Sequence, residues 1–435
     1  MSVADSTLTY QGLASHSRPK LITEVPGPEA MARIDRDRKV TSPSLPRAYP
    51  FVPRRGAGSI VEDVDGNIYL DLNAGIAVTS TGHCHPTVVE AIQKQATELL
   101  HYSASDFYLP IYSDVCERLD AVAPFAGGQA RSFLTNSGTE AVEAAIKLAR
   151  YATGRQNLIG FYQSFHGRSM GSVSLTASKA KYRTHFGPLL PSVYHSFYGD
   201  FDYLEEVLFK RVVSPGEVAA IVVESWLGEG GYVLPPEGWF RYLRELCDHH
   251  GMLLVCDEVQ SGVGRSGTMW AIEQEGVTPD IITSGKGIAS GLPLGAMIAR
   301  EDLMVWELGA HGSTYGGSPL SCAAALATFD VIDREGLMGN ASAVGEVLLT
   351  GFRDIAGRHP LITEVRGRAL WIGLSIADHE QASMIEQIAF RKGLLILGCG
   401  DADIRISPPL VFREDQAQAA LEIFEEVLIE VEARA

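Results

Sequence analysis

The sequence has no long hydrophobic run, no strongly basic segment and no closely spaced cysteine pair. No segment reaches the roughly 20 apolar residues that a membrane-spanning helix requires. The first twenty residues are polar and contain no apolar stretch of signal-peptide length. With 36 basic and 53 acidic residues the net charge is −17, and no Lys/Arg-rich run suits a phosphate backbone. We therefore expect no membrane span and no nucleic-acid partner.

Cysteine spacings typical of metal or disulfide sites are also missing. The six cysteines are scattered, without a C-x-x-C spacing, at positions 84, 116, 247, 256, 322 and 399. This distribution is typical of reduced thiols in a cytoplasmic protein. His83-Cys84-His85 is no better as a metal site, because adjacent residues do not converge easily on one ion and further ligands at a zinc-like spacing are missing. We expect a cytoplasmic protein without a bound metal.

Apolar residues are abundant enough for a substantial core, at 46% hydrophobic against 20% charged. A chain of 435 residues is too long for one simple core. Strand-like apolar runs alternate with helix-like segments until about residue 330, which predicts a mostly parallel sheet covered by helices. We predict an α/β fold with an N-terminal arm and hairpin over 1–72, a large domain over 73–330 and a smaller α+β domain over 331–435. The arm is expected to pack with the small domain.

Two predicted buried strands each end at a residue with catalytic potential. The apolar run 281–283 precedes Lys286, and the run 252–256 precedes Asp257. Continuous apolar runs are typical of strands in parallel sheets, and chemistry collects at the carboxyl ends of such strands. An amine at one strand end and a carboxylate at another suit a lysine that forms a Schiff base while the aspartate holds a protonated pyridine nitrogen. The pairing indicates pyridoxal 5′-phosphate.

Two further segments carry residues that fit such a cofactor. Ser137, Gly138 and Thr139 precede a helix of small residues, where free N–H groups and the helix dipole favour a phosphate, although this pattern by itself is also that of an ordinary N-cap. After a predicted strand at 157–162, Phe165 can stack on a pyridine ring. Arg168 can bind a substrate carboxylate with its planar guanidinium.

A dinucleotide pattern, G-x-G-x-x-G over residues 262–267, also follows a predicted strand. Only residues 268–276 separate it from Thr278-Pro279, which is too short for the crossover helix that carries a pyrophosphate. We therefore predict no NAD site.

Together these segments resemble the class III aminotransferases, a group of the fold-type-I pyridoxal phosphate enzymes. The resemblance runs from about residue 50 to the C-terminus, with eight motifs in the family's order. The matching segments are 74–77 with 81–83, 136–141, 165–168, 228–231, 257–262, 284–287, 312–317 and 404–409.

The resemblance implies a role for each matched residue at the cofactor. Lys286 forms the aldimine and then shuttles the proton, and Asp257 binds the pyridine nitrogen. Phe165 and Val259 enclose the ring, and Gln260 reaches its phenolic oxygen. The remaining cofactor-binding residues are Ser137, Gly138, Thr139, His166 and Thr314 of the partner subunit. That last contribution implies a homodimer, or a dimer of dimers, with shared sites.

Within the family, Ile76, Arg168, Glu229 and Arg405 resemble the substrate-binding set of the 4-aminobutyrate and ornithine branch. There the resemblance implies that Arg405 binds the α-carboxylate of glutamate or 2-oxoglutarate. Glu229 pairs with Arg405 when an ω-amino donor leaves it without a carboxylate, and Arg168 binds the distal carboxylate. Physically this is a charge switch, since one guanidinium is neutralised either by substrate or by the enzyme.

Two departures from the family pattern leave the amino donor open. Residues 225–227 read Ser-Trp-Leu where many relatives have Pro-Val-Gln, with the bulky Trp226 close in sequence to Glu229, and Ser318 replaces a common Asn. Our main hypothesis is transfer from an ω-amino acid such as 4-aminobutyrate to 2-oxoglutarate, with pyruvate open as the acceptor. The alternatives are an ornithine or acetylornithine aminotransferase, and an amino-acid racemase or epimerase. A racemase is an alternative because the same lysine and cofactor can return a proton to either face of the substrate.

Overall fold

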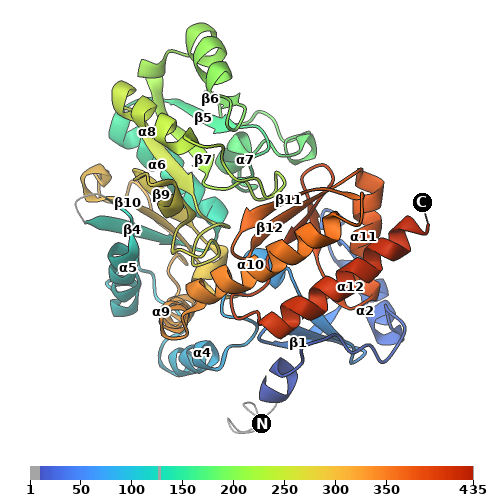
Figure 1. Ribbon diagram of the computed structural model, residues 1–435. Coiled ribbons are helices and arrows are strands. Elements are labelled where there is room, and N and C mark those ends of the chain that lie inside the picture. Colours follow the sequence, from blue (N-terminus) through green and yellow to red (C-terminus); the bar gives the residue numbers. More distant parts are fainter. Residues whose placement is uncertain (1–9, 126–128, 435) are drawn as a thin grey trace.

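The computed structural model describes residues 10–125 and 129–434. Its largest element is a seven-stranded sheet in the order β4-β10-β9-β8-β7-β5-β6 (Figure 1). All of its strands point the same way except β10, which pairs antiparallel with both β4 and β9. The strands are β4 (Ala130–Thr135), β5 (Asn157–Phe161), β6 (Val193–Ser196), β7 (Val218–Glu224), β8 (Leu253–Asp257), β9 (Ile281–Ser284) and β10 (Gly295–Arg300).

Both faces of this sheet are buried, which explains the continuous apolar runs in the sequence. In β7, Ile221 and Val223 join a hydrophobic cluster that includes residues of α8 (Trp239–His250). Ala220 and Val222 instead join a cluster that includes α6 (Gly138–Thr153). Successive strand residues point to opposite faces, so α6 and α8 cover the two sides of the sheet. The predicted α/β fold, with a mostly parallel sheet covered by helices, is confirmed.

The C-terminal part forms a second, antiparallel sheet in the order β11-β12-β15-β14. Two long helices, α10 and α12, lie side by side along it, in orange and red in Figure 1. The strands are β11 (Ile362–Arg368), β12 (Trp371–Ile376), β14 (Leu397–Cys399) and β15 (Asp403–Ile406), and the helices are α10 (Leu337–Ala356), α11 (His379–Arg391) and α12 (Glu414–Glu432).

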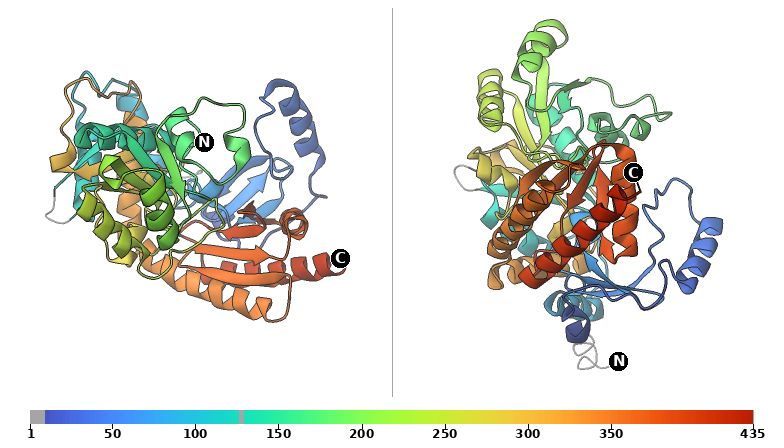
Figure 2. Two further views of the ribbon diagram at one scale, coloured as in Figure 1. Left: turned by 90° about the horizontal axis from the view of Figure 1, so that it is seen from above. Right: turned by 45° about the vertical axis from the view of Figure 1, so that its right-hand side comes forward.

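The N-terminal residues form a third sheet that is completed by a C-terminal strand. The predicted hairpin consists of β2 (Ile60–Asp63) and β3 (Ile68–Asp71), with β1 (Pro53–Ala57) on its outer edge. β3 pairs in parallel with β13 (Leu394–Leu395), so the hairpin is joined to the C-terminal part. The helix α2 (Pro28–Val40), which sequence analysis did not predict, stands at the edge of the molecule (Figure 2). The Asp65 carboxylate in the hairpin turn accepts the N–H groups of Glu29 and Ala30 at the start of α2.

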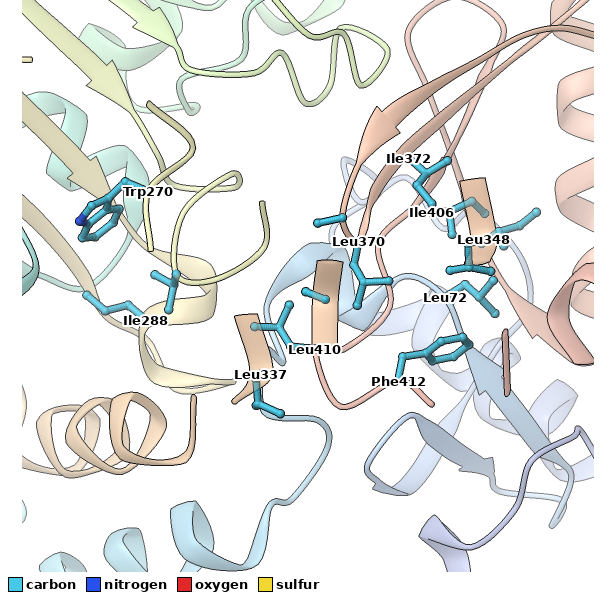
Figure 3. Close-up of a cluster of buried hydrophobic side chains, with 14 of the residues drawn as sticks. Leu72, Trp270, Ile288, Leu337, Leu348, Leu370, Ile372, Ile406, Leu410 and Phe412 are labelled. Atoms are coloured by element: carbon cyan, nitrogen blue, oxygen red, sulfur yellow. The ribbon is translucent and has the colours of Figure 1, made fainter. Parts of the chain in front are cut away.

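One hydrophobic cluster connects the region beside the large sheet with the C-terminal sheet (Figure 3). Trp270 and Ile288 lie at one end of it, and Ile372 and Ile406 of the C-terminal sheet lie at the other. Because this core is shared and closely packed, β15 has a defined position relative to the ends of the large sheet. The remaining helices are α3 (Ala74–Ala77), α4 (Pro86–Glu98), α5 (Pro110–Val122), α7 (Met170–Leu175) and α9 (Pro319–Arg334).

Candidate active site

The predicted site residues follow the carboxyl ends of five strands of the large sheet. The strands β4, β5, β7, β8 and β9 lead into Ser137, Phe165, Glu229, Asp257 and Lys286, respectively. Because these strands are parallel to one another, their carboxyl ends meet at the same edge of the sheet. The fold therefore gathers residues that are far apart in the sequence.

Lys286 lies in a strained turn directly after β9. Its backbone φ of 44° is in the left-handed region, which is unfavourable for a side-chain-bearing residue and is tolerated mainly at functional positions. The side chain keeps some contact with solvent. Burial, and next the charge of Arg405, lower the pKa of Lys286 to about 8. A substantial fraction of this amine is therefore neutral, and nucleophilic, near physiological pH.

Asp257 is held by two donors that orient its carboxylate. One oxygen accepts the Val259 N–H at 3.0 Å, and the other lies 2.7 Å from Nδ1 of the buried His166. Burial lowers the pKa of His166, but the hydrogen bond to Asp257 and its charge outweigh burial, so the pKa is raised overall. The hydrogen bond in turn fixes the orientation of the Asp257 carboxylate. The pair suits an aspartate that must stay charged opposite a protonated ring nitrogen.

The glycines of two motifs allow three loops to pack together. A Cβ on Gly138 would lie 2.6 Å from Cγ1 of Val259, and a Cβ on Gly285 would lie 3.3 Å from Cα of Gly138. A larger side chain at either position would force the phosphate-site loop, Val259 and the lysine loop apart. The structure thus brings Gly138 and Val259 next to the turn that carries Lys286.

The residues predicted to hold a phosphate lie at the N-terminus of α6. Ser137 is the N-cap, and its side chain accepts the Glu140 N–H at 3.5 Å. The Thr139 hydroxyl lies 2.7 Å from the Ser169 hydroxyl and accepts the Ser169 N–H at 3.2 Å, which ties the α6 terminus to the loop after β5. A helix of this length presents free N–H groups and a positive dipole end, so the donor chemistry fits a phosphate.

Gln260 has a partner that sequence analysis missed. The Tyr232 hydroxyl donates to Oε1 of Gln260 at 2.9 Å, which leaves the amide Nε2 as the free donor. The Tyr232 ring stacks on Trp371 of β12, with centroids 3.9 Å apart and planes 5° from parallel.

Trp226 belongs to the same buried cluster as Tyr232 and Trp371, and its indole N–H donates to Glu275 at 3.3 Å. This departure from the family pattern therefore packs behind the site instead of lining it.

A second residue that sequence analysis missed is Glu224, at the end of β7. Its two carboxylate oxygens accept the N–H groups of Phe165 at 2.7 Å and Gly228 at 2.9 Å, so it joins the loops after β5 and β7. Burial is the main cause that raises the pKa of Glu224 to about 7. In the sequence, the position of Glu224 at the end of an apolar run was the signal that could have indicated a site residue.

The predicted charge pair forms across the two sheets. Nη1 of Arg405, from β15, donates to Oε2 of Glu229 at 3.3 Å. The Glu229 backbone carbonyl accepts the Gly400 N–H at 2.7 Å, which places the loop after β7 against the C-terminal sheet.

Arg168, the other predicted carboxylate-binding residue, is exposed. Its guanidinium carbon lies 4.8 Å from the centre of the Tyr182 ring and 5.8 Å from that of Phe165.

Ile76 and Thr314 are not in the loops that follow β4, β5, β7, β8 and β9. Ile76 is 41% exposed and has a φ of 71°, an outlier for a β-branched residue. Its short helix, α3, contacts the turn that begins at Lys286. Thr314 is exposed on the loop before α9.

The family model described as Aminotransferase class-III matches residues 43–428. The chain belongs to the class III aminotransferases. The predicted family and its cofactor, pyridoxal 5′-phosphate, are thereby confirmed, and the protein is a cofactor-dependent transaminase. The roles of the individual site residues stay predictions.

Three similar proteins illustrate the range within this aminotransferase family. The chain is 36% identical to an alanine/serine racemase from Pyrococcus horikoshii, over 94% of this chain and 92% of the relative. It is 42% identical to an acetylornithine aminotransferase from Methanopyrus kandleri, over 86% of this chain and 93% of the relative. The crystal structure of the ornithine aminotransferase from Toxoplasma gondii ME49 superposes with a TM-score of 0.86 at 30% identity, covering 93% of this chain and 96% of that one.

Within residues 10–125 and 129–434, no group of three or more His, Cys, Asp or Glu side chains is arranged to hold a metal ion. In the same part of this aminotransferase, no helix combines the length and the apolar character needed to cross a membrane.

Proposed function

We propose that this aminotransferase transfers the ω-amino group of an ornithine-type donor, ornithine or acetylornithine, to 2-oxoglutarate. The observation that carries the proposal is the ion pair between Glu229 and Arg405. The named relatives support an ornithine-type donor over our main hypothesis of 4-aminobutyrate, because acetylornithine and ornithine aminotransferases are prominent among them.

The ion pair explains how one pocket accepts two kinds of substrate. Arg405 is buried, so its charge needs a partner in every state of the reaction. Glu229 neutralises it while an ω-amino donor is bound, because that donor places an uncharged carbon chain near Arg405. Glutamate and 2-oxoglutarate bring an α-carboxylate that can take the place of Glu229 with a charge-assisted, two-point interaction. The exposed Arg168 is suited to the distal carboxylate, which its planar guanidinium can bind at two points.

The proposal also assigns roles at the cofactor to the remaining predicted residues. Pyridoxal 5′-phosphate supplies the electron sink for the charge that forms when the amino-bearing carbon loses a proton. Lys286 would hold the bound cofactor through its ε-amino group and would carry that proton. Asp257, oriented by His166, would face the pyridine nitrogen. Gln260 would donate its amide N–H to the phenolic oxygen, and Phe165 and Val259 would enclose the ring.

A homodimer with shared sites is part of the proposal. The loop that carries Thr314 also exposes Leu308 and Tyr315, and the neighbouring segment exposes Phe107 and Tyr108. The two segments form one surface, since the Ser105 hydroxyl donates to the Ser313 carbonyl and accepts its N–H, both at 3.0 Å. Grouped exposed apolar side chains mark association surfaces. Thr314 of the partner subunit would then reach the phosphate.

A cytoplasmic location is also part of the proposal. It is supported by the cysteines of the described residues, none of which is in a disulfide.

The test compares two half-reactions in the variant Glu229→Gln. Its kcat/KM for ornithine or acetylornithine should fall at least about tenfold, because Arg405 is left buried without a counter-charge. Its kcat/KM for glutamate should be retained. Glu237→Gln, which neutralises an exposed carboxylate further along the same loop, is the matched control. Equal losses for both substrates would refute the charge switch, and faster turnover of 4-aminobutyrate than of either ornithine-type donor would refute the donor assignment.

A racemase is the second candidate, favoured by the 36% identity to the Pyrococcus horikoshii enzyme over most of both chains. Racemisation requires only that the proton lost from the substrate return to the opposite face of the same carbon. Incubation of the holoenzyme with single L-amino acids in the absence of any 2-oxo acid, followed by chiral chromatography, decides between the two. Accumulation of the D-isomers at a rate above transamination would replace the first proposal.

A further inference from the structure

Glu229 contacts a second cation that the charge switch described above does not use. Nζ of Lys179 lies 3.6 Å from Oε1 of Glu229, and the Tyr182 hydroxyl donates to the same oxygen at 3.1 Å. Arg405 donates to the other oxygen, Oε2, at 3.3 Å. The two oxygens of one carboxylate therefore face two different cationic partners.

The exposure of the side chains to solvent increases from Arg405 through Glu229 to Lys179. The side chain of Arg405 is 7% exposed, that of Glu229 is 17% exposed and that of Lys179 is 32% exposed. Arg405 is thus the inner partner and Lys179 the outer partner. Only the inner partner lies where it can bind the α-carboxylate of a substrate at the strand ends.

This arrangement matters when a substrate carboxylate binds Arg405. Glu229 must then leave Arg405, and a partly buried carboxylate without a cation is unfavourable. Lys179 is well suited to receive it, because a lysine ammonium is a compact charge on a flexible stem that can follow a moving partner. Tyr182 keeps a hydrogen bond on the same side. Arg168 lies against the ring of Tyr182 and is assigned to the distal carboxylate, so within residues 10–125 and 129–434 Lys179 is the second cation that pairs with Glu229.

We propose that Lys179 is the outer partner of Glu229 and sets the balance between dicarboxylate substrates and ω-amino donors. This inference rests on the proposed charge switch and adds a specificity-determining residue to it. Lys179 stabilises the state in which Arg405 is free for an α-carboxylate. Removing its charge favours the closed pair of Glu229 with Arg405, and so disfavours glutamate, 2-oxoglutarate and any unreactive dicarboxylate of the same length.

The chain offers a matched control two residues away. Lys181 carries the same charge, but its ammonium lies over the Tyr182 ring, 5.5 Å from the centroid, instead of against the Glu229 carboxylate. Lys179→Gln and Lys181→Gln change the net charge of the same segment equally. A difference in substrate binding between these two variants therefore reports the contact with Glu229 and not the change in net charge.

The experiment titrates each holoenzyme with glutarate, an unreactive dicarboxylate, and follows the visible absorption of the bound cofactor. The Kd of glutarate should rise about threefold to fivefold in Lys179→Gln, as expected for loss of a partly exposed ion pair, and stay within about twofold of wild type in Lys181→Gln. The ratio of kcat/KM for glutamate over ornithine should fall by a similar factor. Lys179→Arg should restore both values.

The possible failures are distinguishable. A wild-type holoenzyme that shows no saturable response to glutarate would overturn the charge switch, and the role of Lys179 with it. If wild type binds glutarate and Lys179→Gln binds it equally well, only the role of Lys179 is overturned. Equal weakening in Lys179→Gln and Lys181→Gln would also overturn it, because the effect would then come from net charge.

Discussion

The lowered pKa of Lys286 predicts how the cofactor-free enzyme takes up its cofactor. Only the neutral amine attacks an aldehyde, so the rate of covalent capture follows the neutral fraction of Lys286. With the pKa lowered to about 8, this fraction rises from about 9% at pH 7 to about 91% at pH 9, about tenfold, and is constant at higher pH. A lysine with an ordinary pKa of about 10.4 shows a rise of roughly a hundredfold over the same range, without a plateau.

The measurement is stopped-flow absorbance after mixing the cofactor-free enzyme with pyridoxal 5′-phosphate at a series of pH values. The reaction of the cofactor with Nα-acetyl-lysine in the same buffers corrects for ionisation of the cofactor itself. Arg405→Gln tests the cause, because Arg405 is the second contribution to the lowered pKa after burial. In that variant the midpoint of the curve should move above pH 8 but stay below the ordinary lysine value.

Two results would refute the reasoning. A wild-type rate that climbs a hundredfold between pH 7 and 9 and continues to rise would show that the site does not lower the pKa of Lys286. A midpoint near pH 8 that Arg405→Gln leaves unchanged would show that the charge of Arg405 contributes nothing.

Two further predictions concern carboxylates at the strand ends. Asp257→Asn should slow the single-turnover reaction with glutamate by about a hundredfold or more, because a neutral amide does not stabilise a protonated pyridine nitrogen. A near-normal rate in stopped flow would show that another carboxylate has this role. The pKa of Glu224, raised from 4.5 to about 7, means that the folded protein retains a proton that the unfolded chain releases, so this group makes stability fall as pH rises through that window. The difference in Tm between Glu224→Gln and wild type should therefore grow in favour of the variant from pH 5 to pH 7, and a difference that does not change with pH would contradict the assignment.

Some of the site could be predicted from the sequence because the signals are local. An apolar run followed by a polar motif marks a buried strand and the loop after it, as for Lys286 after β9 and Asp257 at the end of β8. In a parallel sheet such loops meet at one edge whatever the strand order. The sequence did not indicate β10, because its antiparallel position between β4 and β9 depends on pairing with strands distant in the chain.

Other residues could not be assigned without three-dimensional contacts. Trp226 stood out in the sequence as a candidate for donor choice, yet it is buried in a cluster with Tyr232 and Trp371. The sequence around Tyr232 contains no motif that indicates its hydrogen bond to Gln260. The helix α2 has a mostly exposed, highly charged surface and gave little hydrophobic periodicity, and part of its N-terminal capping comes from Asp65 in the later hairpin.

The sequence by itself therefore determined the family and the cofactor and indicated candidate reactive side chains, since all of these depend on short motifs that each lie within one loop. Only the tertiary structure decided what those side chains are able to do. The lowered pKa of Lys286 comes from burial and from Arg405 on a different sheet, and the partners of Glu229 lie on two segments far from it in the chain. Burial and charge depend on distances in space, so they arise only when the strand ends and the C-terminal sheet are packed on one core.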